Sequence, residues 1–521
     1  MSQGIGAKLD QIWKCLGPFG KFTVLNYCLL LFPCFLSGMY TSSFNFEAMD
    51  INYRCKIPQC EGLNDTLWLD YAIPKVNNKF DKCNSYEFVD DDGKCDVNSF
   101  NRSSIVKCDA YVYSDEDSIV KDFDLGCQYW KRTFVGSAYS AGYFIALPLT
   151  GIFSDNFGRV KAISVATSMY GVFGLLRSIS TGYVMFVMAA FLETASSAAA
   201  YSASFVFGME LVRPSGRVFG NTLMNFSYIC GSMTLPMIAW WLQDWRRMLR
   251  LVYTPSLFVI FYLLFVNESP RWLLSKGRHE EAIAIVKKAE TMNNIKVPDH
   301  LLASLKASPK SEEDKCESFS SVFVQVVKSK TMSLRLILYC YLWTSCAFGY
   351  YGMSINSVSL AGNKYLNFML VAFIEIPANT LCCMVLNKFG RKKVLITWYT
   401  LSAVFCICLS FLPKQDSIWP LIFYLAGKFS ITVAYTTVYI SVSEAFPTNA
   451  RQSLLAICSS TGRIGSTLAP LTPLLALYYE NLPTIFFGSL ALTASVLSLA
   501  TPETNNLTLP DNTKEAEKIS K

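Results

Sequence analysis

The sequence predicts an all-α membrane protein with twelve transmembrane helices in two six-helix repeats and a large Cys-rich extracellular loop between helices 1 and 2. Composition is the first reason, because 52% of the residues are hydrophobic and only 16% are charged, less charge than soluble proteins of this size carry. Residues 22–46 and 133–154 give the second reason. Each window lacks any charged residue and exceeds the roughly 20 residues that a bilayer-spanning helix needs. A repeated set of polar turns is the third.

These polar turns recur along the chain at a nearly constant distance. Residues 151–159 form a short polar turn between two apolar runs, and residues 387–393 form the same kind of turn later. Three pairs of equivalent charged residues lie 232, 234 and 235 positions apart: Arg159 and Arg391, Glu210 and Glu444, and Glu268 and Glu503. Such a repeat indicates a duplicated membrane unit.

Twelve apolar runs can be placed between the polar segments. Their predicted bounds are 22–46, 133–154, 162–180, 183–209, 218–242, 248–266, 334–357, 365–386, 394–412, 417–441, 453–478 and 483–500. Lysines at positions 8, 14 and 21 place the N-terminus in the cytoplasm, and an even number of spans places the C-terminus there too. The predicted organisation is a cytoplasmic N-tail (1–21), an N-terminal half (22–266), a cytoplasmic linker with short helices (267–332), a C-terminal half (333–500) and a cytoplasmic C-tail (501–521).

Residues 47–130 form a long polar segment with seventeen acidic and nine basic residues. Asn64 and Asn101 each begin an N-glycosylation sequon. An even number of cysteines in a loop-rich stretch suits three disulfides, without fixing which cysteines pair. We therefore predict an extracellular, disulfide-rich subdomain. The candidate cysteines are Cys55, Cys60, Cys83, Cys95, Cys108 and Cys127.

The sequence lacks the motifs of several other functional classes. It has no Walker-type phosphate loop, only two histidines, and no His/Cys spacing typical of a metal site. The formal charge of +7 is scattered between spans, which indicates cytoplasmic-loop bias rather than nucleic-acid binding. We therefore expect a monomer in the lipid bilayer, with no enzyme activity, cofactor, metal or nucleic-acid partner.

Several predicted spans contain charged residues, although an ion costs at least roughly 2.5–3.5 kcal/mol at a helix centre. Four of these residues are candidates for a functional role. They are Glu193, Glu375, Lys428 and Arg463. One interpretation places them in a polar cavity between the halves, where they meet a charged substrate. The alternative is internal ion pairs that only fix the helix register. Arg463 favours the first, because its small neighbours leave room for a ligand.

Aromatic residues offer a second kind of contact for a substrate. Trp343 and Tyr350 are seven positions apart in one predicted helix, hence on one face, and Tyr201 lies among alanines and serines. Such rings can receive an organic cation at about 0.5–2 kcal/mol per contact. Ordinary packing is the alternative for each.

The repeated turns predict a charge network in each half. Asp155 can accept from the backbone at the start of the next helix, and Arg159 can reach a carboxylate across the turn. Glu210 with Arg217, and Glu444 with Arg451, could build the same kind of network. Networks that lock in one state and part in another would form a gate, and a static staple is the alternative. The gating candidates are Asp155, Arg159, Glu210, Arg217, Arg391, Glu444 and Arg451.

Several motifs resemble those of a known family. Residues 151–159, 268–272 and 502–504 resemble signature turns of the major facilitator superfamily. The Cys-rich first loop, residues 118–127 and residues 444–451 are similar to its organic cation/anion/carnitine transporter family. The resemblance runs nearly end to end. It implies a polyspecific carrier for small organic ions that works by alternating access.

The resemblance also bears on the substrate. Arg463 stands where the cation carriers have an aspartate and looks like the arginine of the anion and carnitine carriers, whereas Asn379 stands where anion carriers tend to have a lysine. Residues 201–210 and 427–434 look closest to the carnitine carriers. We therefore expect a plasma-membrane carrier of a cationic or zwitterionic solute, such as carnitine or an amino-acid-like amine. The expected substrate-binding residues are Arg463, Trp343, Tyr350, Tyr201, Lys428 and Glu375.

Other functions stay open on the sequence. An organic anion carrier is the nearest alternative, and a non-transporting receptor that uses the extracellular loop is another. A sugar carrier is disfavoured by the mid-span charges, because neutral sugars are usually bound by amides and hydroxyls. The coupling ion, Na⁺ or H⁺ if there is one, is not fixed.

Overall fold

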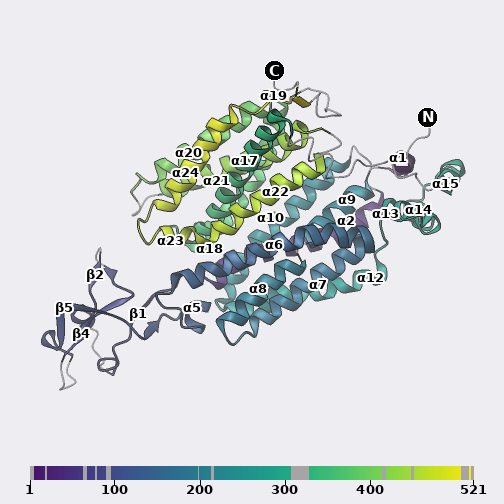
Figure 1. Ribbon diagram of the computed structural model, residues 1–521. Helices are drawn as coiled ribbons and strands as arrows, with labels where there is room; N and C mark the ends of the chain where they lie inside the picture. Colours follow the sequence, from purple (N-terminus) through teal and green to yellow (C-terminus); the bar gives the residue numbers. More distant parts are fainter. Residues whose placement is uncertain are drawn as a thin grey trace.

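The computed structural model describes residues 5–17, 20–62, 67–76, 79–89, 95–197, 199–212, 216–306, 328–413, 418–447, 451–505 and 516–517. These residues are mostly helical and form two helical bundles, one from each half of the chain (Figure 1). A small β-rich subdomain lies at one end of the first bundle, called here the disulfide end. Short helices lie at its opposite end, called here the linker end (Figure 1).

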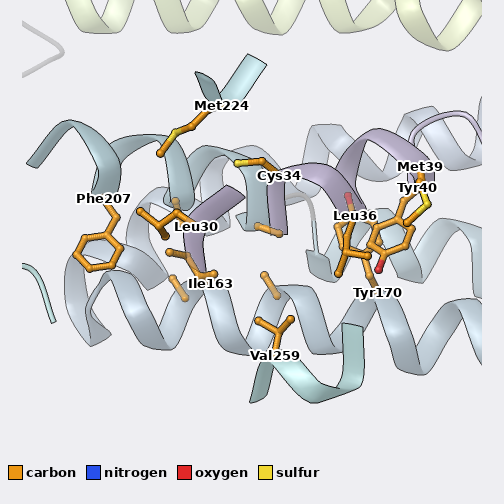
Figure 2. Packing of buried hydrophobic residues seen from close by; sticks show 14 of the residues in the cluster. Leu30, Cys34, Leu36, Met39, Tyr40, Ile163, Tyr170, Phe207, Met224 and Val259 are labelled. Atoms are coloured by element: carbon orange, nitrogen blue, oxygen red, sulfur yellow. The ribbon is translucent and has the colours of Figure 1, made fainter. Parts of the chain in front are cut away.

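The first bundle is formed by the described helices between residues 21 and 265, apart from those of the subdomain. Its helices are α2 (Lys21–Tyr40), α3 (Phe44–Glu47), α6 (Tyr129–Phe157), α7 (Arg159–Ser178), α8 (Tyr183–Ser197), α9 (Ala199–Leu211), α10 (Arg217–Leu242), α11 (Trp245–Leu257), η3 (Phe258–Phe261) and α12 (Tyr262–Phe265). Its core surrounds α2, whose Leu30, Cys34 and Tyr40 point toward neighbouring helices (Figure 2). Helices α2 and α10 approach closely, since a Cβ on Gly231 would lie 1.9 Å from the backbone oxygen of Phe35.

The second bundle has a separate core and a matching set of helices. They are α17 (Lys330–Asn356), η4 (Ser357–Ser359), α18 (Lys364–Phe373), α19 (Glu375–Phe389), α20 (Arg391–Leu409), α21 (Trp419–Ala445), α22 (Arg451–Leu468), η5 (Ala469–Leu471), α23 (Thr472–Leu475) and α24 (Leu482–Ser498). Helix α17 packs on α22, and α20 on α21 and α24. The two bundles contact each other through α6 with α22 and α10 with α18.

The subdomain at the disulfide end corrects the all-α prediction, because it contains antiparallel strand pairs. Strand β1 (Tyr53–Cys55) pairs with β6 (Tyr111–Tyr113), β2 (Lys75–Val76) with β3 (Lys79–Phe80), and β4 (Asn84–Phe88) with β5 (Phe100–Lys107). Short helices α4 (Leu69–Ala72), η1 (Val97–Ser99) and α5 (Ile119–Asp122) complete it. Two-stranded ribbons are marginal alone, so covalent links are needed to hold them.

All six predicted disulfide candidates are paired in this subdomain. The disulfides are Cys55–Cys108, Cys60–Cys95 and Cys83–Cys127. Asn101 is exposed on β5, where a glycan would meet solvent, and Asn64 lies outside the described residues. Arg246 of α11 donates to Asp122 of the subdomain at 2.8 Å, which ties the subdomain to the bundle.

The linker end carries α1 (Ile5–Cys15), α13 (Pro270–Ser275), α14 (His279–Asn293) and α15 (Asp299–Lys306). Ser269 caps α13 by accepting a hydrogen bond from the Trp272 amide at 3.2 Å, and Pro270 occupies the first helical position, where it has no N–H to leave unpaired. Asn293 of α14 accepts from the Phe22 amide at 3.0 Å, so α14 holds the start of α2.

Within the described residues, six helical stretches are long and apolar enough to cross a membrane. They are Lys21–Glu47, Tyr183–Leu211, Trp245–Phe265, Lys364–Leu386, Arg391–Leu409 and Trp419–Ala445. Helix α22 is not among them, because its sequence carries serines, threonines and Arg463 between its apolar residues. These polar residues matter for the cavity described next.

Candidate functional site

A central cavity lies between the two bundles. The first bundle contributes residues of α6, α10 and the segment from Thr41 to Asn45, and the second contributes residues of α17, α18, α19 and α22. Tyrosines and small hydroxyl residues dominate its wall: Tyr139, Tyr143, Tyr228, Tyr350, Tyr351, Thr41, Ser42, Ser140, Ser232, Ser354 and Ser466. Two charged side chains also line it, Glu375 and Arg463. The cavity therefore offers aromatic faces, hydroxyl groups and one ion of each sign.

Arg463 reaches the cavity from α22. Its guanidinium carbon lies 5.0 Å from the ring centroid of Tyr143, which belongs to the other bundle. The glycines beside it bring α22 close to α17, since a Cβ on Gly465 would lie 2.5 Å from the Thr344 carbonyl oxygen. The small residues flanking Arg463 thus serve helix packing first, and that packing sets where the arginine emerges.

Glu375 is neutralised by a lysine behind the cavity wall. The Lys428 ammonium lies 3.1 Å from Glu375 Oε1 and is fully buried. It also donates to the Tyr350 carbonyl oxygen at 3.0 Å and to Ser354 Oγ at 2.7 Å, and it lies 3.3 Å from the Tyr350 ring centroid. An ammonium with these partners is well satisfied, so the predicted role of Lys428 becomes that of a support for Glu375 and Tyr350.

The predicted aromatic residues lie at different depths. Tyr350 lines the cavity and stacks on Tyr435 with centroids 5.4 Å apart. Trp343 is buried one layer behind, against Tyr435 and Tyr439. Tyr201 donates to Asn225 and packs edge-on against Tyr228, which lines the cavity. The structure therefore brings Tyr350, Glu375 and Arg463 to the wall and places Lys428, Trp343 and Tyr201 in the layer that supports it.

The first repeated turn forms a charge network at the linker end. Arg159 pairs with Asp155 at 2.6 Å and with Glu210 at 3.1 Å. The Glu268 carboxylate accepts from the backbone amides of Arg159 and Val160 at 3.0 and 3.1 Å, so it caps the start of α7. Burial raises the pKa of Glu268 above its usual range, even though these backbone hydrogen bonds act in the opposite direction.

The second repeated turn copies this arrangement. Arg391 pairs with Glu444 at 2.9 Å, and Glu503 accepts from the amides of Arg391 and Lys392 at 2.9 and 3.1 Å. In the first half Glu210 pairs with Arg159 rather than with Arg217. In the second half Glu444 pairs with Arg391 rather than with Arg451. Arg217 instead pairs with Asp10 of α1 at 3.6 Å, and Arg451 is the first residue of α22.

One buried cluster was not predicted from the sequence as a unit. The Arg177 guanidinium lies between the carboxylates of Glu47 and Glu193, and all three side chains are fully buried in the first bundle. Internal ion pairs are one of the two predictions for Glu193, and its partner is Arg177 rather than Lys428 or Arg463. Arg177 falls inside the predicted span 162–180, so its charge was the available signal. Glu47 ends the charge-free window 22–46 and was assigned to the polar loop. No group of three or more His, Cys, Asp or Glu residues suited to a metal occurs in the part of the chain that the structure describes.

Comparison with known proteins shows which family has this sequence pattern and fold. A family model described as sugar (and other) transporter matches residues 99–515. The chain is 29% identical to the organic cation transporter protein of Drosophila melanogaster, over 98% of this chain and 95% of that protein. It is 27% identical to organic cation/carnitine transporter 2 of Homo sapiens, over 96% and 92%. It is also 30% identical to solute carrier family 22 member 15-like of Xenopus laevis, over 72% and 77%.

Among solved structures, the fold matches the inward open conformation of the xylose transporter XylE from E. coli. The TM-score is 0.63 and the identity 17%, and the match covers 95% of this chain and 99% of that one. At this identity the likeness concerns the fold alone. The family match covers most of the sequence, and the predicted resemblance to the major facilitator superfamily is confirmed. The chain therefore belongs to the sugar (and other) transporter family of that superfamily and is a membrane transporter, not an enzyme.

Proposed function

We propose that this transporter carries a small zwitterionic or cationic organic solute, such as carnitine or an amino-acid-like amine, across the plasma membrane by alternating access. The observation that carries the proposal is the charge pattern of the cavity. Glu375 is matched by Lys428, whereas Arg463 faces the cavity over the ring of Tyr143. A solute with a carboxylate at one end and an ammonium at the other is complementary to this arrangement.

Each end of such a solute has a physical partner on the wall. Arg463 can hold the carboxylate through charge-assisted hydrogen bonds. The ammonium end fits beside Tyr351 and Glu375, because the Tyr350 ring already carries Lys428 and stacks on Tyr435. In this proposal Trp343, Tyr201 and Lys428 act from the second layer, by holding Tyr435, Tyr228 and Glu375 in place.

The proposal includes a topology of twelve spans in two halves, 22–266 and 333–500. The subdomain 47–130 is extracellular, and the tails 1–21 and 501–521 and the linker 267–332 are cytoplasmic. Three disulfides support an oxidising compartment for the subdomain, and the helices α13, α14 and α15 lie at the opposite end of the bundle (Figure 1). The chain is proposed to act as a monomer without a cofactor, and Na⁺ and H⁺ are the candidate coupling ions.

The two turn networks supply the mechanical part of the proposal. Each joins three segments of its own half, through Arg159, Glu210 and Glu268 or through Arg391, Glu444 and Glu503. Such networks let each half move as a rigid body around a central site, as alternating access between repeats requires. The proposed gating residues are Asp155, Arg159, Glu210, Arg217, Arg391, Glu444 and Arg451.

Uptake of carnitine and choline tests the role of Arg463, because both solutes are quaternary amines and only carnitine has a carboxylate. A charge-assisted hydrogen bond contributes about 1.5–3 kcal/mol. Arg463→Ala is therefore expected to lower carnitine uptake by roughly ten-fold or more at low solute concentration and to spare choline uptake, while Arg463→Lys keeps part of the carnitine uptake. If Arg463→Ala leaves both uptakes unchanged, the assignment is wrong.

Arg463 has no acidic ion-pair partner among the described residues, and its charge therefore also favours a second candidate, an organic anion. A monocarboxylate without an amine, added to the same cells, distinguishes the two. Uptake of the monocarboxylate that exceeds uptake of carnitine would favour the anion carrier. Repeating the carnitine measurement with and without sodium identifies a sodium-coupled mechanism.

A further inference from the structure

The buried cluster of Glu47, Arg177 and Glu193 lies outside the central cavity and has no part in the site described above. Arg177 Nη2 contacts Glu47 Oε1 and also lies 3.2 Å from Ser43 Oγ, and Arg177 Nη1 lies 2.9 Å from Glu193 Oε2. The three side chains come from α3, α7 and α8, and none is exposed to solvent. The cluster therefore links three helices of the first bundle through buried ion pairs.

The charges of this cluster do not balance. Arginine stays protonated in proteins, so one positive charge faces two carboxyl groups. A net charge held away from water is costly, and a buried ionisable group neutralises rather than remain unpaired. The balanced state of the cluster therefore holds one proton on its pair of carboxyl groups. Two buried oxygens of the cluster, Glu47 Oε2 and Glu193 Oε2, have no hydrogen-bond partner in the described part of the chain. Glu193 Oε2 lies 2.9 Å from Arg177 Nη1, so Glu47 Oε2 is the oxygen available for the proton.

Among the described residues, the groups that face the cluster supply no second positive charge. From α11, Tyr253 donates to Glu193 Oε1 at 2.7 Å and lies 3.1 Å from Ser43 Oγ. Tyr40 of α2 stacks on Tyr253, and Tyr170 of α7 lies beside Tyr40. Tyr139 of α6 donates to the Tyr40 carbonyl oxygen, and Phe186 of α8 lies under Arg177. All of these side chains are neutral.

Helix α3 connects the cluster to the contact between the bundles. Glu47 faces Arg177, while Phe44 and Asn45 of the same short helix line the central cavity. Phe46 packs on Tyr365 and Phe368 of α18 in the second bundle, with ring centroids 5.8 and 5.2 Å apart. A movement of α18 away from the first bundle therefore acts on the helix that carries Glu47.

We propose that Glu47, Arg177 and Glu193 form a proton-binding site that gains and loses one proton as the bundles part and close at the disulfide end, so that proton movement accompanies solute transport. The proton is taken from water outside while the disulfide end is open and is given up to water inside while the linker end is open, and no other group is consumed. This inference rests on the proposed function for its solute, carnitine, and names the coupling ion that the proposed function leaves open.

The first test uses the purified full-length protein in proteoliposomes that contain a fluorescent pH indicator. Entry of carnitine is expected to change the internal pH in the wild type. Glu47→Gln and Glu193→Gln each leave one carboxylate opposite Arg177, a neutral pair that needs no proton. Both variants are expected to move carnitine with a proton-to-solute ratio at least ten-fold below that of the wild type.

The second test needs no solute and reports the proton directly. Infrared difference spectra of the protein at neutral pH, wild type minus variant, are expected to show a protonated carboxyl stretch that is missing from both glutamine variants. Glu61→Gln is the matched control, because Glu61 pairs with Arg54 in the subdomain and both side chains are partly exposed. It is expected to keep the wild-type proton ratio and the wild-type carboxyl signal.

The outcomes separate this inference from the proposed function. Carnitine entry without a change of pH in the wild type, or full proton movement in both glutamine variants, would overturn the proton site. If the wild type moves no carnitine, the solute assignment fails, and the infrared signal still decides whether the cluster holds a proton. An identical carboxyl spectrum in the wild type and both variants would reject it.

Discussion

Burial separates two basic side chains that the sequence presents alike. Lys428 and Arg463 both lie inside predicted spans, and both are predicted to contact substrate. Lys428 is fully buried and has a carboxylate, a carbonyl, a hydroxyl and a ring as partners. Arg463 is only partly buried and opens on the cavity. A residue that meets a ligand must keep some of its hydrogen-bonding capacity unused, and Arg463 satisfies this condition better.

The support role of Lys428 can be tested through its partner. Glu375→Gln leaves the buried ammonium without its counter-charge, which typically costs about 3–5 kcal/mol when a buried pair is broken. We expect a clear fall in the thermal stability of the detergent-solubilised protein. Adding Lys428→Met, which removes the orphaned charge, is expected to recover most of the loss. If Glu375→Gln unfolds at the wild-type temperature, Lys428 does not depend on this carboxylate.

Two glycines set the geometry of the repeated turns at the level of helices. Gly158 and Gly390 end α6 and α19 with φ of 107° and 83° and ψ of 163° and 166°, in a region that is essentially open to glycine alone. A Cβ at Gly158 would lie 2.3 Å from Glu268 Oε2, and one at Gly390 would lie 2.5 Å from Glu503 Oε2. The glycine therefore permits both the chain reversal and the carboxylate cap of the next helix.

Alanine at either glycine is expected to destabilise the protein by roughly 1–3 kcal/mol, the usual cost of such backbone strain, and to displace the capping glutamate as well. Thermal unfolding in detergent and carnitine uptake measure the two effects. Gly151→Ala is the control, because a Cβ there meets nothing within 4 Å. Equal stability of the three variants would show that the turns tolerate a side chain.

The sequence predicts these turns well because their signal is local and repeated. It predicts the pairing within them less well, since Glu210 and Arg217 are close along the chain but Arg159 lies closer to Glu210 in space. Glu47 was missed because it borders both an apolar window and an acidic loop, and only the arginine of another helix shows that it is buried. The strand pairs of the subdomain escaped prediction because disulfides hold strands that are mostly short, and the longest, β5, is exposed along most of its length and shows no alternating pattern.

At the scale of the whole molecule, the two bundles contact each other at the disulfide end, and the subdomain contacts the second bundle there. Lys364 of α18 donates to Glu116 of the subdomain at 2.8 Å, and Phe46 packs on Tyr365 and Phe368 nearby. A Cβ on Gly136 of α6 would lie 2.7 Å from the side chain of Pro470, so the bundles also approach closely there. In the proposed topology this end faces outside, and access from outside requires these contacts to part.

Changing the Lys364–Glu116 pair is a way to shift the equilibrium between the states in which the disulfide end is closed and open. It is partly exposed, and exposed pairs contribute about 0.2–1 kcal/mol, so breaking it shifts a two-state population by at most about five-fold. Glu116→Lys places two like charges across the contact. It is therefore expected to raise, by up to about five-fold, the rate at which a membrane-impermeant cationic thiol reagent added outside cells labels Ser466→Cys in the cavity. The charge-swapped double variant, Glu116→Lys with Lys364→Glu, restores the attraction and should return the rate to that of Ser466→Cys alone. A double variant that labels as fast as Glu116→Lys would show that the effect comes from the altered subdomain surface and not from the contact between the halves.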